Sequence, residues 1–374
     1  MANIFLIWGG YGNENLGDEA CLLASARLLE KNRPGARTGL ILRMRPSAEV
    51  ADRYRSWGLE PIYCFSFLCL QWLWRAQLIV GGGGMVDDDT PWFPVAWSSL
   101  FVFLNKLFGN EPVFFCIGAN PIHRRFTKTL VKMFYSLAQT IITRDIKSFN
   151  VLIAERVPRN RLRLARDVVF SLDRDTLPSF KRDKRERPHV VLVVRNDSAR
   201  TPGQSDFFAA IAEQFVEAGC SVCLTVHDLR MEYDLGILLQ LERRFHDNAL
   251  ITVSKPNCLH HVLHLFASAD AVVSSRYHPI ILASILGSTP IAVSHSLTMK
   301  LGSLVDDLGV PVLKHMESRA SQVDEIRSIF AKEELVRANI SGKVREFKLA
   351  VEDAVGRALD PTGSLQEAQP EIAA

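Results

Sequence analysis

Short apolar runs alternate along the chain with segments in which apolar residues recur at helical spacing. The runs are typical of strands buried on both faces of a parallel sheet, and the segments between them are typical of helices that cover such a sheet. Strands are predicted at 3–8, 38–43, 62–65, 77–80, 113–118, 140–144, 168–172, 189–194, 222–226, 250–253, 271–275 and 289–293. Helices are predicted at 48–57, 67–74, 126–137, 207–216, 233–245, 257–267, 280–286, 299–308 and 321–359. The pattern therefore predicts an α/β protein with parallel sheets.

One stretch interrupts the alternation. Residues 172–188 are highly charged and contain two prolines, as is typical of a linker between domains. We therefore expect an N-terminal Rossmann-like domain at 1–171, the linker at 172–188 and a C-terminal Rossmann-like domain at 189–318, followed by helices at 319–359 and a polar, disordered tail at 360–374. Two doubly wound domains of this kind are expected to face each other across a cleft.

Charge and cysteine content narrow the function classes. The 374 residues carry a formal net charge of only +3, which argues against a protein that binds nucleic acid through phosphate contacts. The seven cysteines are an odd number scattered through apolar segments, which indicates reduced thiols and a cytoplasmic protein. The first apolar run is too short for a signal peptide.

The basic runs and the tryptophan-rich region Trp72–Trp97 are compatible with peripheral contact with an anionic membrane. Five arginines lie between Arg156 and Arg166, and 181–187 adds five more basic residues. The segment from Trp92 to Phe108 is strongly apolar, but Pro94 and Lys106 interrupt it. It falls short of the roughly 20 apolar residues that span a bilayer, so we interpret it as a buried or interfacial helix.

A glycine-rich turn follows the first predicted strand and reads G-G-Y-G-N-E-N-L-G-D-E-A. It does not match a dinucleotide fingerprint, because Asn15 occupies the place of the third glycine. Gly12, Asn13 and Asn15 are candidates for backbone or amide contacts with a ligand. Alternatively, Asn15 caps the following helix and Asp18 interacts favourably with its N-terminus. Both interpretations can hold together.

A second glycine run, Gly81, Gly82, Gly83 and Gly84, follows the strand at 77–80. Glycine costs backbone entropy, so four in succession favour close approach of the backbone to a ligand over packing alone. We expect no metal site in the chain. Asp87–Asp89 form an acidic loop of the kind that is usually solvated, and the histidines at 260, 261 and 264 have metal-ligand spacing without an acidic partner.

The strongest candidate site is the strand-to-helix turn at Arg276, Tyr277 and His278. Pro279 then stands where the first turn of a helix tolerates proline. Open α/β sheets hold their ligands at this carboxyl edge, and an arginine and an imidazole beside a helix N-terminus form an anion pocket with a proton donor. The alternative is that Arg276 pairs with a nearby carboxylate and His278 caps the helix. Arg195, which ends the strand at 189–194, lies at the same edge.

These motifs together resemble the polysaccharide pyruvyl transferase family. The resemblance rests on G-x-x-N-x-G-D-E-A at Gly12–Ala20, the glycine run at 81–84, Ala165-Arg166-Asp167, and S-x-R-Y-H-x-x-I-x-A-x-x-x-G-x-P at Ser274–Pro290 with Lys300 beyond it. Tyr277 stands where leucine is usual. The resemblance implies a glycosyltransferase-B-like fold and transfer of pyruvate from phosphoenolpyruvate to a sugar or a lipid-linked oligosaccharide, usually as a ketal, with no further cofactor.

Carried over by position, the resemblance assigns Arg195, Arg276, His278 and Lys300 to the donor. A carboxylate and a phosphate suit arginines and helix N-termini, and protonation of the donor's methylene carbon suits an acid such as His278. Asp18 is either the base for the acceptor or a helix cap. Two alternatives remain: a sugar-nucleotide-dependent glycosyltransferase, disfavoured because 278–286 contains no Glu or Asp, and a non-catalytic saccharide-binding protein.

Overall fold

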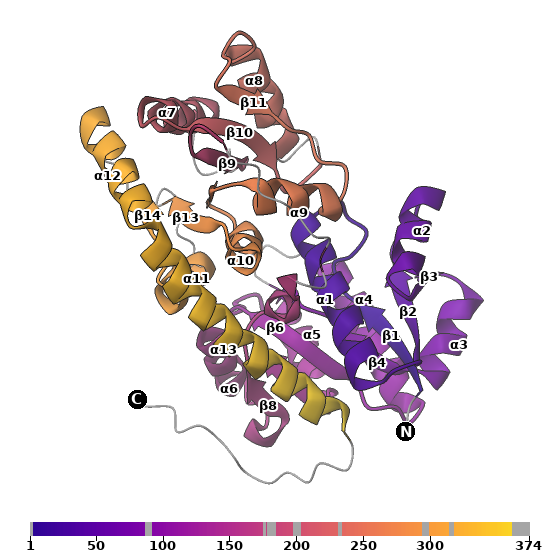
Figure 1. Cartoon of the computed structure of the whole chain (residues 1–374). Coiled ribbons are helices and arrows are strands. Elements are labelled where there is room, and N and C mark those ends of the chain that lie inside the picture. The colour runs from indigo at the N-terminus through magenta and orange to yellow at the C-terminus, as the bar shows by residue number, and fades with distance from the viewer. Residues whose placement is uncertain are drawn as a thin grey trace. The chain divides into compact units, whose positions relative to one another are not determined.

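The fold is taken from a computed structural model (Figure 1), and the structure describes residues 3–86, 92–174, 177, 185–196, 203–230, 234–293, 299–313 and 318–360. The chain forms two compact units. The first comprises Met1–Gly9, Ser25–Val168 and Leu349–Ala374, and the second comprises Gly10–Ala24 and Val169–Lys348. The expected tail from residue 361 onward lies outside the described residues.

The first unit contains a parallel sheet in which the described strands run in the order β3-β2-β1-β4-β6-β7-β8, with β5 paired to β6. Its strands are β1 (Ile4–Trp8), β2 (Arg37–Leu42), β3 (Leu59–Tyr63), β4 (Gln77–Val80), β5 (Gly83–Val86), β6 (Val113–Ala119), β7 (Thr140–Thr143) and β8 (Leu162–Leu164). Strand order reverses between β1 and β4, so the glycine-rich turns after these two strands both begin at a topological switch point.

Helices of the first unit cover this sheet because each buries apolar side chains against it. They are α2 (Ala48–Ser56), α3 (Phe67–Arg75), α4 (Trp92–Leu107), α5 (Arg125–Ser136) and α6 (Ile146–Ala154), with a 3₁₀ turn at Arg159–Arg161. Ser47, Ser66 and Asp145 cap three of them by accepting hydrogen bonds from first-turn amides. The core they form with the sheet includes Phe114 and Phe134, which are fully buried.

The second unit contains a six-stranded parallel sheet in the order β11-β10-β9-β12-β13-β14. Its strands are β9 (His189–Val194), β10 (Ser221–Val226), β11 (Ile251–Val253), β12 (Ala271–Ser274), β13 (Thr289–Val293) and β14 (Val312–Leu313). Its helices are α7 (Gln204–Glu217), α8 (Gly236–Arg244), α9 (Leu259–Ser268), α10 (Tyr277–Leu286), α11 (Met299–Leu308) and α12 (Arg319–Ala331). The switch point of this sheet lies between β9 and β12.

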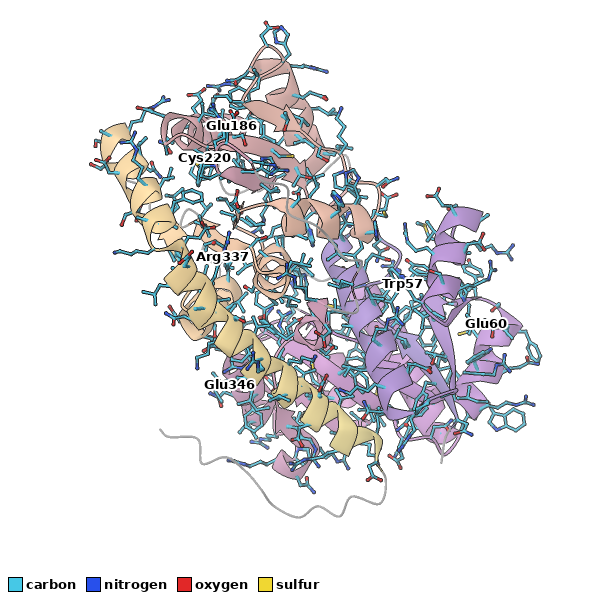
Figure 2. The ribbon with its side chains drawn as sticks, viewed as in Figure 1. Trp57, Glu60, Glu186, Cys220, Arg337 and Glu346 are labelled. Atoms are coloured by element: carbon cyan, nitrogen blue, oxygen red, sulfur yellow. The ribbon has the colours of Figure 1, made fainter. Side chains whose placement is uncertain are left out.

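Two helices contribute to both units: α1 (Leu16–Asn32) and α13 (Glu333–Leu359) each begin in the second unit and end in the first. Within the second unit, Arg337, which Figure 2 labels on α13, donates hydrogen bonds to the Asp270 carbonyl at 2.7 Å and to Thr289 Oγ1 at 3.0 Å. These contacts fix the helix beside the starts of β12 and β13.

The predicted alternation of strands and helices is confirmed, with one wrong element and several that were missed. Val168–Ser171 forms a 3₁₀ helix and not the expected strand. A short apolar run cannot distinguish the two, and Val168 is buried against the site of the missing Cβ of Gly82. The pattern also missed helix α6 and the strands β5, β8 and β14. Strands β8 and β14 have only three and two residues.

Candidate functional site

Three polar residues lie together at the carboxyl edge of the second sheet because three neighbouring strands end in register. Val193 of β9 pairs with Ser274 of β12, and Val194 pairs with Val226 of β10. Arg195 and His227 follow β9 and β10 directly, and Arg276 follows β12 after one residue, so the three lie on both sides of the switch point. The expected grouping of Arg195 with Arg276 at one sheet edge is present, and His227 is an addition to it.

Asp234 connects the ends of β9 and β12. Its Oδ1 atom accepts a hydrogen bond of 2.6 Å from Arg276 Nη2 and one of 2.8 Å from the Asn196 amide. The Asp234 side chain is fully buried, and burial raises the pKa of its carboxyl group although the charge of Arg276 opposes the shift. Arg276 thus pairs with a carboxylate, as one interpretation of the sequence predicted. Its buried Nε atom, however, has no hydrogen-bond partner in the described part of the chain.

Helix α10 begins at the same edge of the sheet, directly after Arg276. Arg276 occupies the N-cap position without a side-chain cap, and its own amide donates to Ser274 Oγ at 2.9 Å. The predicted helix is confirmed: Pro279 lies in its first turn and Gly287 ends it in a left-handed conformation at φ 79°. A helix N-terminus beside a guanidinium is suited to binding an anion.

His278 lies against α1. A Cβ at Gly17 would come within 2.2 Å of His278 Nδ1, so only glycine leaves room for the ring there. On the next turn of α1, Cys21 Sγ contacts His278 Nε2 at 3.4 Å. The imidazole ring therefore packs against α1 beside Gly17 and Cys21, which fixes the plane of the ring. His278 does not act as the N-cap of α10, because that position belongs to Arg276.

The glycine-rich turn at the start of α1 is held by its own polar side chains. Asn15 Oδ1 accepts from the Gly17 amide at 3.0 Å, which confirms the predicted cap. Asn13 donates to the Gly10 carbonyl, and Glu19 accepts from the Gly12 amide. Asp18 is half-buried in the first turn, where its charge also favours the helix.

This turn is joined to the segment that follows β10. The Leu16 amide donates to the His227 carbonyl at 3.0 Å, the Leu229 amide donates to the Glu14 carbonyl at 3.1 Å, and Asn15 and Asp228 form an antiparallel bridge. These bonds place the start of α1, and with it Gly17 and Cys21, in the second unit.

His227 is an unusual residue in this group. It is 1% exposed, its ring stacks on Phe266 with centroids 6.4 Å apart, and among the described residues neither ring nitrogen has a hydrogen-bond partner. Burial and the positive charges of His278 and Arg276 lower its pKa well below the ordinary value. The site thus holds a neutral imidazole next to two groups that attract anions.

In the first unit, part of the second glycine run lies in a strand. Gly83 and Gly84 belong to β5 and pair with Ile117 and Gly118 of β6, while the Gly81 amide donates to the Trp8 carbonyl. A Cβ at Gly82 would come within 2.7 Å of Val168 Cγ1. Packing and pairing therefore account for part of the run.

The motif residue Asp167 is buried in the first unit and accepts from Arg144 Nη1 at 3.3 Å. A Cβ at Gly118 would come within 2.8 Å of the Arg144 guanidinium, so the small residue makes room for the pair. Burial and the charge of Asp167 raise the pKa of the nearby Cys116 thiol well above its usual value. None of the seven cysteines, all of which the structure describes, forms a disulfide.

An aromatic cavity of about 150 Å³ lies at the carboxyl edge of β1, β2 and β3 in the first unit. Its lining comprises Trp8, Arg43, Met44, Cys64, Phe65, Trp97 and Phe101. The Trp8 indole already donates to Ser98 Oγ at 2.9 Å, so the cavity offers mostly apolar surface. It is suited to a ligand with a small apolar group next to an anion, because Arg43 supplies the positive charge.

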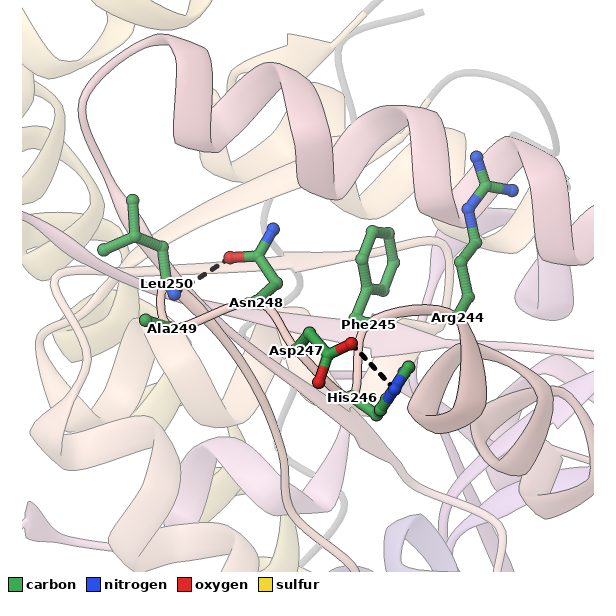
Figure 3. A pocket seen from close by; sticks show the side chains of 7 residues that line it. All are labelled: Arg244, Phe245, His246, Asp247, Asn248, Ala249 and Leu250. Carbon is green, nitrogen blue, oxygen red and sulfur yellow. Dashed lines mark hydrogen bonds and ion pairs between the residues drawn. The ribbon is translucent and has the colours of Figure 1, made fainter.

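A depression in the second unit does not belong to the site. It is lined by consecutive residues from Arg244 to Leu250 on the turn between α8 and β11 (Figure 3). Because this turn precedes β11, it lies at the amino edge of the parallel sheet, opposite the edge that carries Arg276.

Sequence reasoning missed Gly17, Cys21, His227 and Asp234 as parts of the site. Gly17 carried a signal, because glycine inside a helix costs about 1 kcal/mol relative to alanine and needs a reason. His227 follows a predicted strand directly at the ligand edge, whereas Asp234 lies in a predicted helix. Asp87–Asp89 and the side chain of Lys300 lie outside what the structure describes.

Two parallel α/β sheets with a basic, histidine-containing ligand edge define a glycosyltransferase-B-like protein, and solved structures with this fold match nearly the whole chain. HepE of Anabaena in complex with UDP-glucose has a TM-score of 0.62 at 10% identity, covering 95% of this chain and 98% of that one. The UDP-GlcNAc 2-epimerase of Neisseria meningitidis bound to UDP-GlcNAc has a TM-score of 0.61 at 12% identity, with 94% and 97% covered.

S. aureus MnaA with UDP has a TM-score of 0.65 at 10% identity, with 96% of each chain covered. At these identities the likeness concerns the fold alone. No curated protein matches the sequence. The sequence profile of polysaccharide pyruvyl transferase, however, matches residues 15–296, and the chain belongs to that family of transferases. The match spans α1, Arg195 and the Arg276–His278 turn.

Proposed function

We propose that the protein transfers pyruvate from phosphoenolpyruvate to a sugar of a surface polysaccharide or of its lipid-linked precursor, with formation of a ketal. The observation that carries the proposal is the grouping of Arg195, Arg276 and His278 at the switch point of the second sheet. Phosphoenolpyruvate carries a carboxylate and a phosphate, and this edge offers two guanidinium groups and the N-terminus of α10. The reaction is placed on the cytoplasmic side of the membrane.

The chemistry requires one acid and two hydroxyl groups. A proton is added to the methylene carbon of phosphoenolpyruvate, and a sugar hydroxyl attacks the resulting cationic carbon and loses its proton. The bond between that carbon and the phosphate oxygen then breaks and inorganic phosphate leaves. A second hydroxyl attacks the same carbon, loses its proton and closes the ketal. His278 is assigned as the acid, held in plane by Gly17 and Cys21. Arg276 and Arg195 bind the donor's anionic groups.

The acceptor is assigned to the first unit, where the aromatic cavity beside Arg43 suits an apolar group next to an anion. Asp18 is the candidate base at the acceptor hydroxyl. A sugar-nucleotide donor is less well supported, because α10 contains no Asp or Glu that could hold a ribose.

The test is release of phosphate from phosphoenolpyruvate in the presence of candidate acceptors, with release of UDP from UDP-sugars measured in parallel. Arg276→Lys keeps the charge but loses the planar fork, so donor affinity is expected to weaken by about 1–3 kcal/mol. His278→Gln is expected to lower turnover by roughly 10²–10⁴-fold with a smaller effect on donor binding. UDP release without phosphate release, or normal turnover in both variants, contradicts the proposal.

A further inference from the structure

Helix α4 has apolar side chains on both of its faces. Val102 is buried in the core of the first unit, whereas Trp92, Leu100, Phe103 and Leu107 are 55%, 40%, 44% and 65% exposed. These four positions follow one another at helical spacing and form a stripe along the outside of the helix. A surface helix of a soluble protein ordinarily has a polar outer face, so this stripe points to an apolar partner outside the chain.

The stripe continues onto both neighbouring helices. Helix α3, which packs against α4, exposes Phe67 (77%), Trp74 (59%), Leu68 and Leu70. Helix α5, which also packs against α4, exposes Phe126 (62%) and Met133. The Trp92 and Phe126 rings meet edge to face with centroids 6.0 Å apart. Single exposed apolar residues are normal, but a contiguous face of this kind marks an interaction surface.

The charges of this α3–α5 face are of one sign. The three helices contain no aspartate or glutamate, and with the N-cap Arg124 they carry six basic residues: Arg75, Lys106, Arg124, Arg125, Lys128 and Lys132. Glu111 and Glu155, outside these helices, pair with three of the lysines, so positive charge remains in excess. An anionic partner fits this face.

From these observations we infer that the α3–α5 face docks on the surface of an anionic lipid bilayer. Exposed tryptophan, phenylalanine and leucine flanked by lysine and arginine is the composition of helices that lie in the membrane interface. No described helix is long and apolar enough to cross a membrane, so the face lies on the bilayer. A second copy of the chain fits less well, because a twofold contact would bring like charges together. The inference does not depend on the proposed reaction.

This surface differs from the basic run that the sequence suggested. Arg161 of that run donates hydrogen bonds to the carbonyls of Ser136 and Ala138, and so holds the end of α5. Part of the run is therefore structural, and the apolar residues needed for insertion lie on α3, α4 and α5.

The test is flotation of the full chain, without substrates, with vesicles of phosphatidylcholine alone or with about one third phosphatidylglycerol. The face variant is Phe103→Gln with Leu107→Gln. Its matched control is Leu335→Gln with Leu349→Gln on α13, where the leucines are 63% and 60% exposed. The wild type and the control are expected to float with anionic vesicles, less so in 0.5 M salt. The face variant is expected to partition at least about tenfold more weakly, because two apolar side chains leave the interface.

Thermal unfolding of both variants and light scattering of all three proteins complete the experiment. Failure of the wild type to bind anionic vesicles overturns the inference whatever the variants do, as does equal binding of the face variant and the wild type. A dimer that the face variant dissociates, without vesicle binding, assigns the face to a second copy instead. Should the double variant unfold, Leu107→Gln against Leu335→Gln gives the same comparison.

Discussion

Arg276 and Asp234, which are 42 positions apart, form a 2.6 Å ion pair. The same Asp234 oxygen accepts a hydrogen bond from the backbone amide of Asn196, the residue after Arg195. A single buried carboxylate thereby fixes the two strand ends that carry the basic residues of the site. Removing one partner of such a pair leaves the other charge without compensation, whereas an exposed pair contributes little.

Asp234→Asn is expected to raise the KM for phosphoenolpyruvate by about tenfold or more, with a smaller fall in kcat, because Arg276 loses a charge-assisted hydrogen bond that orients it. Asp206→Asn is the matched control, since Asp206 pairs with Arg244 while 84% of its side chain is exposed. Steady-state kinetics with varied phosphoenolpyruvate separate the effect on KM from the effect on kcat. An unchanged KM in Asp234→Asn would mean that other contacts orient Arg276.

Gly17→Ala is expected to lower kcat by about 10²-fold, approaching the effect of losing the acid itself, because the added methyl group displaces the His278 ring. Alanine favours the helix, so we expect only a small decrease in the free energy of unfolding beside the large decrease in kcat. Gly342→Ala in α13 is the control, since a Cβ there meets nothing within 4 Å. Rates and melting temperatures of both variants decide the point. Equal activity of both variants would show that His278 need not lie against α1.

His227 predicts a pH dependence of stability. Its pKa is lowered in the folded protein by burial and by the nearby positive groups, while the unfolded chain takes up a proton near the ordinary value of about 6.5. The contribution to stability is therefore lost as pH falls below about 6.5, at up to about 1.4 kcal/mol per pH unit. In His227→Phe this loss is absent. Between pH 7.5 and 5.0, the free energy of unfolding measured in urea is expected to decrease less for the variant than for the wild type. Equal decreases in the two proteins would show that His227 is not the source of the pH dependence.

Asn105→Ala is expected to destabilise the first unit by roughly 1–3 kcal/mol, because it leaves buried backbone groups unpaired. Asn105 is fully buried, accepts from the Leu78 amide and donates to the carbonyls of Leu73 and Ala76. Asn248→Ala, which loses one bond to the Leu250 amide on an exposed turn, serves as the control. Chemical denaturation gives both values, and similar losses in the two variants would argue that the Asn105 contacts are dispensable.

Activity is expected to persist in a metal chelator, because Arg195, Arg276 and the amides of α10 supply positive charge for the donor without a cation. The measurement is phosphate release before and after treatment with EDTA. Loss of activity that magnesium or manganese restores would contradict this and direct attention to Asp87–Asp89.

The sequence by itself determined the alternation of strands and helices and the turns that carry the site. Buried parallel strands must be continuously apolar, so β9, β12 and β13 are legible, and residues directly after them lie at one edge whatever the packing. Arg195 and the Arg276–His278 turn could be predicted for this reason. Short elements such as β14, with two residues, could not, because they hold no more than one period of strand alternation.

Only the tertiary structure decided which side chains meet at that edge. Cys21 and His278 are separated by 257 positions, and nothing in local spacing indicates that the imidazole lies between the thiol and Gly17. Likewise, Asp234 could have been one more solvated carboxylate, and Trp92 and Leu107 could have been core residues. Burial and contact depend on how helices pack on the sheets, which periodicity restricts to a face but does not resolve to individual partners.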